Sequence, residues 1–513
     1  MSRVLGISAS LRNARFGLKQ DSLAHDVVGI MNQHDLMLYL ASHTQINSKD
    51  FIQAGKAEGL PFEDIYGRLK KFGKKRGLSN SEAALAAALW AAHREGSEIQ
   101  QLSLARYFPI SGAPRHLEEL RNAILSADGL IISGPVYFGD RGSLAQSLIE
   151  FISADPILRR ACKGKVYAGL AVGAKRNGGQ ETTLIYQMLD MINLDFLAVG
   201  NSSETTAQYG GTAVAGDIGQ LYLDEYGIET CLGTGQRVAR VSQLLSQSKT
   251  SSAGLKDKLK IQLWLLQDDR ARTGLGHFKT WAQGLMDGRH DLDVQLYDAV
   301  REEVVRCIAC DICPTHIGAK EEYRCIITSP ADFFVNYHQA LVQADGILLC
   351  AYSPKNRSSA ISVYQQFMER TRYLRRDNYA FSDVVIAPFV ISELFARQNL
   401  HLRMLTSGVR HHTVLHHPII GMINDGVLLG SDSLLKYGAD FAEAAMQVTV
   451  GRYLVGHRDD LVYRPIGYEV GTEKSNDDAI SGKTKEALSK ISRSVDVAAE
   501  KRLERAKLAP GGF

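Results

Sequence analysis

The chain has 513 residues, of which 45% are hydrophobic and 22% charged, and its formal net charge is only +3. These values are ordinary for a globular protein of about two to four domains, and the near-neutral balance argues against a nucleic-acid or membrane-surface partner. No segment approaches the roughly 18 uncharged apolar residues of a membrane helix, and the N-terminus is too polar for a signal peptide, so we expect a cytoplasmic protein.

The first half alternates strand and helix patterns, beginning with a short apolar strand at Arg3–Ser8. Further strands are predicted at Glu98–Leu104, Gly129–Ser133, Val166–Val172 and Phe196–Val199, and helices at Asn80–Glu95, Leu117–Ser126, Ser143–Ile152, Thr182–Ile192 and Gly227–Ser246. Such alternation predicts a parallel sheet covered by helices on both faces. Five strands suit the flavodoxin-like order, in which the ligand lies at the carboxyl ends of the strands.

A segment of about residues 18–76 interrupts this alternation between the first strand and the first good helix. It reads as mostly helical. An insertion on the ligand side of a sheet predicts a lid, a dimer contact or a partner surface.

A polar, Ser- and Lys-rich stretch at Gln247–Lys260 predicts a linker. After it the pattern restarts, with strands at Ile261–Leu266, Leu292–Tyr297, Gly346–Leu349 and Val384–Val390 and helices at Phe278–Asp287, Asp332–Gln343 and Ala360–Thr371. Ala-Asp-Gly opens a strand in both Ser126–Tyr137 and Gln343–Pro354, which favours a duplication.

We therefore predict two doubly wound α/β domains and a tail. The first domain spans residues 1–246, with the helical insertion, and the second spans residues 261–470. Residues 471–513 form a charged helical tail, with a helix at Lys483–Lys507, that is solvated, bridges subunits or is partly disordered.

Two polar segments flank the insertion, and together they predict an anion site. The first strand runs into Gly-Ile-Ser-Ala-Ser-Leu-Arg, in which Ser8, Ser10 and Arg12 offer donors. After the insertion, Ser79, Asn80 and Ser81 open an Ala-rich helix whose N-terminus is the positive end of its dipole. The alternative interpretation is a Ser-rich turn and an ordinary helix cap.

Two more loops follow later strands of the first half. Gly134–Ser143 carries a stiffening proline and two aromatic side chains, Tyr137 and Phe138. Gly173–Glu181 contains glycines that permit close backbone approach to a ligand. Both loops lie at the edge of the sheet where the first loop ends.

With these three motifs in order, the sequence resembles the NADPH-dependent FMN reductases and their iron–sulfur flavoprotein relatives over about Arg3–Ala239. The resemblance implies that FMN binds here and that NAD(P)H is a possible electron donor. It implies that the phosphate is held by Ser8, Ser10, Arg12, Ser79, Asn80 and Ser81, and that the ring is flanked by Pro135, Val136, Tyr137, Phe138, Gly139, Gly173, Arg176, Asn177 and Gly178. The insertion departs from the compact phosphate loop of the family.

Four of the seven cysteines fall within 19 residues, spaced Cys307-x2-Cys310-x2-Cys313-x11-Cys325. Such crowding argues against a disulfide framework. Three thiolates on a tight loop and a fourth further along predict a [4Fe–4S] cluster; a zinc site and uncoordinated thiols are the alternatives. Iron–sulfur flavoproteins carry a similar compact motif before a helix with acidic residues, where Ala331-Asp332 stands here.

The second half lacks the flavin features of the first. Its loops read Gln267-Asp268-Asp269-Arg270, Ala351-Tyr352-Ser353-Pro354 and Glu393-Leu394-Phe395-Ala396. We therefore expect it to keep the cysteine motif without a second flavin. We expect Cys162, Cys231 and Cys350 to be buried small residues. The segment with His411, His412, His416 and His417 predicts a strand with neighbours on opposite faces rather than a metal site.

The sequence thus predicts an FMN-dependent oxidoreductase that passes electrons between NAD(P)H or a protein donor, FMN and a [4Fe–4S] cluster. No catalytic side chain is named, because the flavin itself carries the hydride. The alternative is an electron-transfer or assembly protein without a small-molecule substrate, its cysteines holding an iron–sulfur cluster or zinc. We expect a homo-oligomer with a small-molecule or protein electron partner.

Overall fold

The computed structural model describes residues 1–12, 22–44, 48–72, 77–201, 208–216, 219–251, 255, 257–310, 313, 325–375 and 379–455. The predicted tail at residues 471–513 lies outside this range. No helix in the described parts of the chain is both long and apolar enough to span a lipid bilayer.

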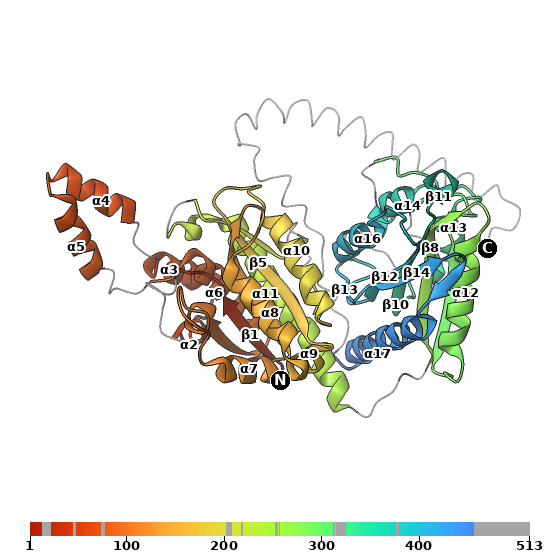
Figure 1. The fold of residues 1–513 in the computed structure, drawn as a ribbon, viewed down its shortest axis with the longest axis horizontal. Coiled ribbons are helices and arrows are strands. Elements are labelled where there is room, and N and C mark those ends of the chain that lie inside the picture. Colours follow the sequence, from red (N-terminus) through yellow and green to blue (C-terminus); the bar gives the residue numbers. More distant parts are fainter. Residues whose placement is uncertain are drawn as a thin grey trace, which may run out of the picture. The chain divides into compact units, whose positions relative to one another are not determined.

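The first half builds a parallel sheet in the order β2-β1-β3-β5, followed by a fifth position that β6 and β7 share (Figure 1). This is the predicted flavodoxin-like order. Its strands are β1 (Arg3–Ser8), β2 (Glu98–Ser103), β3 (Gly129–Tyr137), β4 (Asp140–Arg141), β5 (Val166–Gly173), β6 (Leu197–Ala198) and β7 (Gly211–Val214). Strands β1 and β5 and the first five residues of β3 are almost wholly buried, as expected for a sheet covered on both faces.

The helices of the first half follow the predicted alternation closely. They are α6 (Asn80–Arg94), α7 (Leu117–Ser126), α8 (Ser143–Ala154), α9 (Pro156–Cys162), α10 (Gln180–Asn193) and α11 (Glu225–Thr250), with 3-10 turns η1 (Leu104–Arg106) and η2 (Leu221–Leu223). Helix α6 is buried over most of its length, and small alanine side chains, at seven of its 15 positions, let its neighbours pack closely. Gly235 of α11 lets that helix approach α6 closely, since a Cβ there would lie 1.9 Å from the carbonyl oxygen of Ala88.

The insertion is helical, as predicted. It contains α2 (Ser22–Val28), α3 (Gln33–Ser42), α4 (Ser48–Ala57) and α5 (Phe62–Phe72). Buried leucine and valine side chains of α2 and α3 join the core around α6, and the Trp90 indole donates to the carbonyl oxygen of Ile30 at 2.9 Å. The first two helices of the insertion are therefore part of the fold.

The second half repeats this topology, in the order β9-β8-β10-β12 followed by a fifth position shared by β13 and β14. Its strands are β8 (Leu259–Asp269), β9 (Leu292–Asp298), β10 (Gly346–Ser353), β11 (Ala360–Ser362), β12 (Val385–Glu393), β13 (Val414–Leu415), β14 (Ile419–Asn424) and β15 (Val427–Leu429). Its helices are α12 (Thr273–Met286), α13 (Phe333–Leu341), α14 (Tyr364–Arg370), α15 (Arg372–Arg375), α16 (Leu400–Gly408) and α17 (Ser431–Val455), with η3 (Arg357–Ser359) and η4 (Val409–His411).

Both halves split the fifth strand into two short pieces and end in a long helix, α11 of 26 residues and α17 of 25. This shared detail supports the predicted duplication. The predicted domain boundaries remain a prediction.

Two local predictions are wrong. Residues 360–362 were expected in a helix but form β11, which pairs antiparallel with Gln267–Asp269, the last three residues of β8, beyond the part that pairs with β9. The linker predicted at Gln247–Lys260 is too long at both ends, since α11 continues to Thr250 and β8 begins at Leu259.

The two sheets join into one through an antiparallel pair between Ala198 of β6 and Leu415 of β13. Helices α11 and α17 also touch, since a Cβ at Gly451 would lie 2.3 Å from the carbonyl oxygen of Leu244. A buried ion pair, Arg237 with Asp383, adds a third link between the halves.

Candidate functional site

Three loops of the first half start side by side at the carboxyl edge of its sheet. In the β1–β3 register Ser8 pairs with Ser133, and in the β3–β5 register Pro135 pairs with Val172. The chain therefore leaves β1, β3 and β5 at neighbouring points, at the edge where open α/β sheets bind ligands.

Ser133 brings the two predicted phosphate segments together. The backbone N–H of Ala9 donates to the Ser133 carbonyl oxygen at 2.7 Å, and the Ser133 hydroxyl donates to the Ser81 carbonyl oxygen at 2.7 Å. Ser8 and Ser10 are buried beside this junction, whereas Arg12 is exposed. The fold thus places the first loop against the start of α6 despite the insertion. Sequence reasoning missed Ser133, whose only signal is a hydroxyl directly after the apolar run Gly-Leu-Ile-Ile.

A capping box opens α6 at Ser79. The Ser79 hydroxyl oxygen accepts from the Glu82 N–H at 3.1 Å, and the Glu82 carboxylate accepts from the Ser79 N–H at 3.0 Å. The 15-residue helix points its positive dipole end at the first loop. The predicted roles of Ser79, Asn80 and Ser81 in phosphate binding stay predictions, and this arrangement supports them.

Burial raises the pKa of the Glu82 carboxyl to about 7, and hydrogen bonds from Ser79 lower it only in part. The pKa of a glutamate in an unfolded chain is about 4.3. Between this pKa and that of folded Glu82, the folded state binds more protons than the unfolded state, so the free energy of unfolding falls as pH rises. Glu82→Gln keeps an acceptor for the Ser79 N–H, and it is expected to remove this pH slope and stabilise the protein by up to about 3 kcal/mol at pH 8. Urea unfolding of wild type and variant at pH 5 and pH 8 measures the change in the free energy of unfolding with pH. Glu58→Gln, at an exposed position, is the control; equal slopes in Glu82→Gln and wild type would contradict the assignment.

The second loop is a tight β3–β4 hairpin with two exposed aromatic rings. Phe138 and Gly139 both have positive φ, 53° and 77°, the mirror-image turn that suits a two-residue hairpin. The Tyr137 side chain is 51% exposed and that of Phe138 is wholly exposed. Exposed aromatic surface beside a ligand edge fits the predicted contact with a flat ring.

The third loop is held by Gln180, the first residue of α10. Its amide oxygen accepts from the Gly178 N–H at 2.8 Å, and its amide nitrogen donates to the Lys175 carbonyl oxygen at 2.8 Å. Gly179 then contacts the second loop, because a Cβ there would lie 2.8 Å from the Cα of Gly139. The two loops predicted to flank the ring are therefore in direct contact.

Gly179→Ala is expected to weaken FMN binding by about 5- to 100-fold, since a strained backbone costs about 1–3 kcal/mol. The residue has φ +97°, and its new Cβ would collide with the hairpin. Fluorescence quenching of FMN measures the affinity. The matched control is Gly164→Ala, which has φ +73° but no atom within 4 Å of the new Cβ. Wild-type affinity in Gly179→Ala would contradict the loop assignment.

Arg176, predicted beside the ring, is engaged elsewhere. Its guanidinium donates to the Thr212 carbonyl oxygen at 2.8 Å, pairs with Asp224 and lies over the Tyr226 ring at 4.8 Å. The side chain thus ties the third loop to β7 and α11. A direct contact with flavin stays a prediction for Arg176 and for its neighbour Asn177, whose φ of 59° is left-handed.

The four cysteines of the motif are all partly buried thiols. The structure describes all four of these cysteines, and among the described residues no three His, Cys, Asp or Glu side chains lie together as a metal site, so three of the thiols do not converge here. Cys307 lines a cavity of about 400 Å³ together with Arg372, Arg375 and Arg410. The donor set suits an iron–sulfur cluster, because thiolates ligate iron and the nearby guanidinium groups would balance the negative charge of a thiolate-bound cluster. That the four thiols come together around a cluster remains a prediction.

One residue that lines the cavity beside Cys307 contacts the first half of the chain. Arg410, which lines it, lies over the Tyr209 ring at 5.9 Å. Tyr209 lies two residues before β7. Arg410 therefore links the cavity beside Cys307 to the segment that leads into β7.

The histidines of the segment His411–His417 lie in separate environments. His411 contacts the Thr371 hydroxyl at 3.0 Å, His412 contacts the Ser382 hydroxyl at 2.8 Å, and His417 stacks on Tyr437. Burial lowers the pKa of His411 to about 3, so the ring is neutral. Cys162, Cys231 and Cys350 are buried, which confirms their predicted place in the core.

The ligand edge of the second half is filled by its own side chains. The buried Asp268 carboxylate accepts from the N–H groups of Gly274 and Leu275, at 2.8 and 3.1 Å, in the first turn of α12. The chain thus supplies an anion where a phosphate would lie. The Tyr352 hydroxyl likewise donates to Glu393 at 2.7 Å. Both contacts support the expectation of no second flavin.

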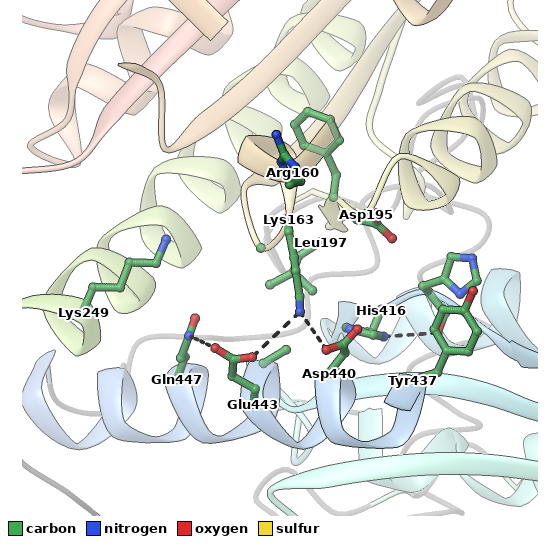
Figure 2. Close-up of a pocket in the computed structure, with 14 residues that line it drawn as sticks. Arg160, Lys163, Asp195, Leu197, Lys249, His416, Tyr437, Asp440, Glu443 and Gln447 are labelled. Carbon is green, nitrogen blue, oxygen red and sulfur yellow. Dashed lines mark hydrogen bonds and ion pairs between the residues drawn. The ribbon is translucent and has the colours of Figure 1, made fainter. Parts of the chain in front are cut away.

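A second cavity, of about 270 Å³, lies at the opposite, amino edge of the first sheet (Figure 2). Figure 2 shows Lys163, which precedes β5, directed at Asp440 and Glu443 of α17, with Nζ–O distances of 2.7 and 3.9 Å. The cavity is small for a cofactor and far from the carboxyl ends of the strands. We read it as packing space at the junction of the halves.

Comparison with known proteins identifies a family to which the chain is similar. The family model described as NADPH-dependent FMN reductase matches residues 72–204. An iron–sulfur flavoprotein of Methanocaldococcus jannaschii is 34% identical over 189 residues, which cover 34% of this chain and 96% of that protein. An iron–sulfur flavoprotein of Methanosarcina thermophila is 28% identical over 202 residues, 39% of this chain and 96% of that protein.

Among solved structures, a WrbA-like flavodoxin from Agrobacterium tumefaciens aligns with a TM-score of 0.27 and 14% identity, covering 47% of this chain and 98% of its own. From the 34% identity to an almost fully covered relative and the three loops that meet at one edge of the sheet, the chain belongs to the family of NADPH-dependent FMN reductases and iron–sulfur flavoproteins.

Proposed function

We propose that the chain is an FMN-dependent oxidoreductase. In it, electrons pass between NAD(P)H or a protein donor, FMN bound by the first half, and a [4Fe–4S] cluster on Cys307, Cys310, Cys313 and Cys325. The observation that carries the proposal is the meeting of three loops at the ends of β1, β3 and β5, joined through Ser133 and through the Gly139–Gly179 contact.

The chain's own groups suit the parts of FMN. The start of α6, together with the loop of Ser8 and Ser10, offers N–H and hydroxyl donors and a positive dipole to a phosphate. The aromatic hairpin offers a flat apolar surface to the ring, and the N-terminus of α10, which lies against this hairpin through the Gly139–Gly179 contact, would offer a second positive dipole end. When bound, FMN supplies both hydride and single-electron exchange.

Two observations support one flavin and one cluster for each chain. Asp268 supplies its own carboxylate at the start of α12, where a second phosphate would have to bind. The two relatives described above are both named iron–sulfur flavoproteins, and the cysteine motif of this chain is bordered by arginines.

The experiment is anaerobic purification of the full chain, followed by visible spectroscopy and by flavin, iron and sulfide analysis. We expect one FMN and about four iron and four sulfide ions per chain, and bleaching of the flavin bands by NADPH or NADH. A preparation without flavin would overturn the proposal. Zinc in place of iron would overturn its cluster. Failure of both nicotinamides to bleach a loaded flavin would replace the nicotinamide donor by a protein donor.

A further inference from the structure

Arg370, the last residue of α14, is a buried arginine aimed at the fourth cysteine of the motif. Its side chain is 1% exposed. One end of the guanidinium donates to Sγ of Cys325 at 2.7 Å, and the other donates to the carboxylate of Asp332 at 2.5 Å. A single planar group therefore joins a thiol and a carboxylate inside the protein.

Asp332 holds the guanidinium in this orientation. The carboxylate is fully buried, and its second oxygen accepts from the backbone N–H of Val305 at 2.9 Å. The guanidinium also lies over the Phe334 ring, 5.2 Å from its centroid. Asp332 fixes one terminal nitrogen of the guanidinium, and the Phe334 ring covers one of its faces. The other terminal nitrogen is therefore directed at Cys325.

A buried ion pair of this kind is weak as a stabilising device. Apolar side chains of similar volume often stabilise a core equally well, because removing two charges from water costs several kcal/mol. The ion pair with Asp332 is therefore weak evidence that Arg370 is there for stability. What the arginine adds is a charged donor on the sulfur of a predicted ligand.

The same short segment of chain borders the other end of the motif. Met368, Glu369, Thr371 and Arg372, the immediate neighbours of Arg370, line the cavity that Cys307 also lines. Arg370 thus contacts Cys325 directly and is flanked by residues that line the cavity beside Cys307. Hydrogen bonds and positive charge at a ligating sulfur favour the more reduced form of an iron–sulfur cluster and orient the ligand.

We propose that Arg370, pinned by Asp332, is a positioning residue that presents Cys325 as the fourth cluster ligand and raises the reduction potential of the cluster. The inference rests on the proposed function, since it requires a cluster on this motif. This gives a role to Asp332, the residue that precedes α13, because its carboxylate neutralises and orients Arg370.

The test compares anaerobically purified wild type, Arg370→Gln and Arg370→Lys in a potentiometric titration followed by electron paramagnetic resonance. We expect a more negative cluster potential in Arg370→Gln and an intermediate one in Arg370→Lys, which keeps the charge but not the two-pronged donor. Iron is expected to pass to a chelator several-fold faster in Arg370→Gln. An unchanged potential in both variants would overturn the inference. If Arg370→Gln does not fold, the cluster potential of Arg370→Lys is the test, and a potential equal to that of wild type would overturn the inference.

Arg237→Lys is the matched control. Arg237 is equally buried, at 1% side-chain exposure, but its guanidinium pairs with Asp383 and bonds to the carbonyl oxygen of His412. Its replacement is expected to lower stability and leave the cluster potential unchanged. A wild-type protein without iron would refute the proposed cluster itself; a loaded wild type with insensitive Arg370 variants would refute only the role of Arg370.

Discussion

Replacing Arg237 with methionine is expected to lower the free energy of unfolding at pH 7 by about 3–5 kcal/mol, because it leaves a buried carboxylate without its main partner. Arg237 lies in α11 of the first half, and Asp383 lies just before β12 of the second. The guanidinium also donates to the His412 carbonyl oxygen at 2.6 Å. Arg240, 3.7 Å from the same carboxylate, offsets only part of the loss.

The effect depends on pH in a defined direction. Burial by itself would raise the pKa of Asp383, but the positive charges of Arg237, His412 and Arg240 hold it well below its ordinary value. The pair therefore stabilises the fold fully above the unfolded pKa of about 3.9, and this contribution is lost as pH falls below that value. The difference between wild type and Arg237→Met is expected to shrink between pH 5 and pH 3.

Chemical denaturation at these pH values measures both parts of the prediction. Arg289→Met is the control, because Arg289 and Asp291 form an exposed pair of the kind that contributes less than about 1 kcal/mol. A loss below 1 kcal/mol in Arg237→Met would show that the junction of the halves does not depend on this pair.

Replacing Cys307 and Cys310 together by serine is expected to remove nearly all iron and sulfide from the purified protein while FMN stays bound. The cysteines follow β9 of the second half, whereas the three flavin loops belong to the first. Serine is a poor ligand for iron beside thiolates, so two serines leave too few ligands for a cubane cluster.

Iron, sulfide and flavin analysis of the same preparations measures the outcome. Cys162→Ala is the control, because Cys162 is buried in the first half and outside the motif. Full iron content in the double variant would place the cluster elsewhere. Loss of FMN along with iron would show that the two sites are not independent.

Much of the architecture follows from local sequence pattern. The apolar run after Asp128 predicts a strand, and the alanines after Ser79 predict a helix, because both elements depend on the periodicity of neighbouring residues. The sequence pattern predicts the ends of an element wrongly where pairing with a neighbouring strand determines how far the element extends. Strand β3 continues four residues past Ser133, to Tyr137, because its end pairs with β5 and β4. Residues 360–362 became a strand because β8 extends past the end of β9 and its last three residues pair with them.

The sequence by itself determined the two α/β repeats, the three polar loops at strand ends and the cysteine spacing, since each depends on residues close together in the chain. Only the tertiary structure decided which distant residues meet: Ser133 with Ser81, Gly179 with Gly139, and Arg370 with Cys325. These contacts join residues on different elements, and no local periodicity encodes them. They arise because parallel strands end at a common edge and because buried polar groups must find partners.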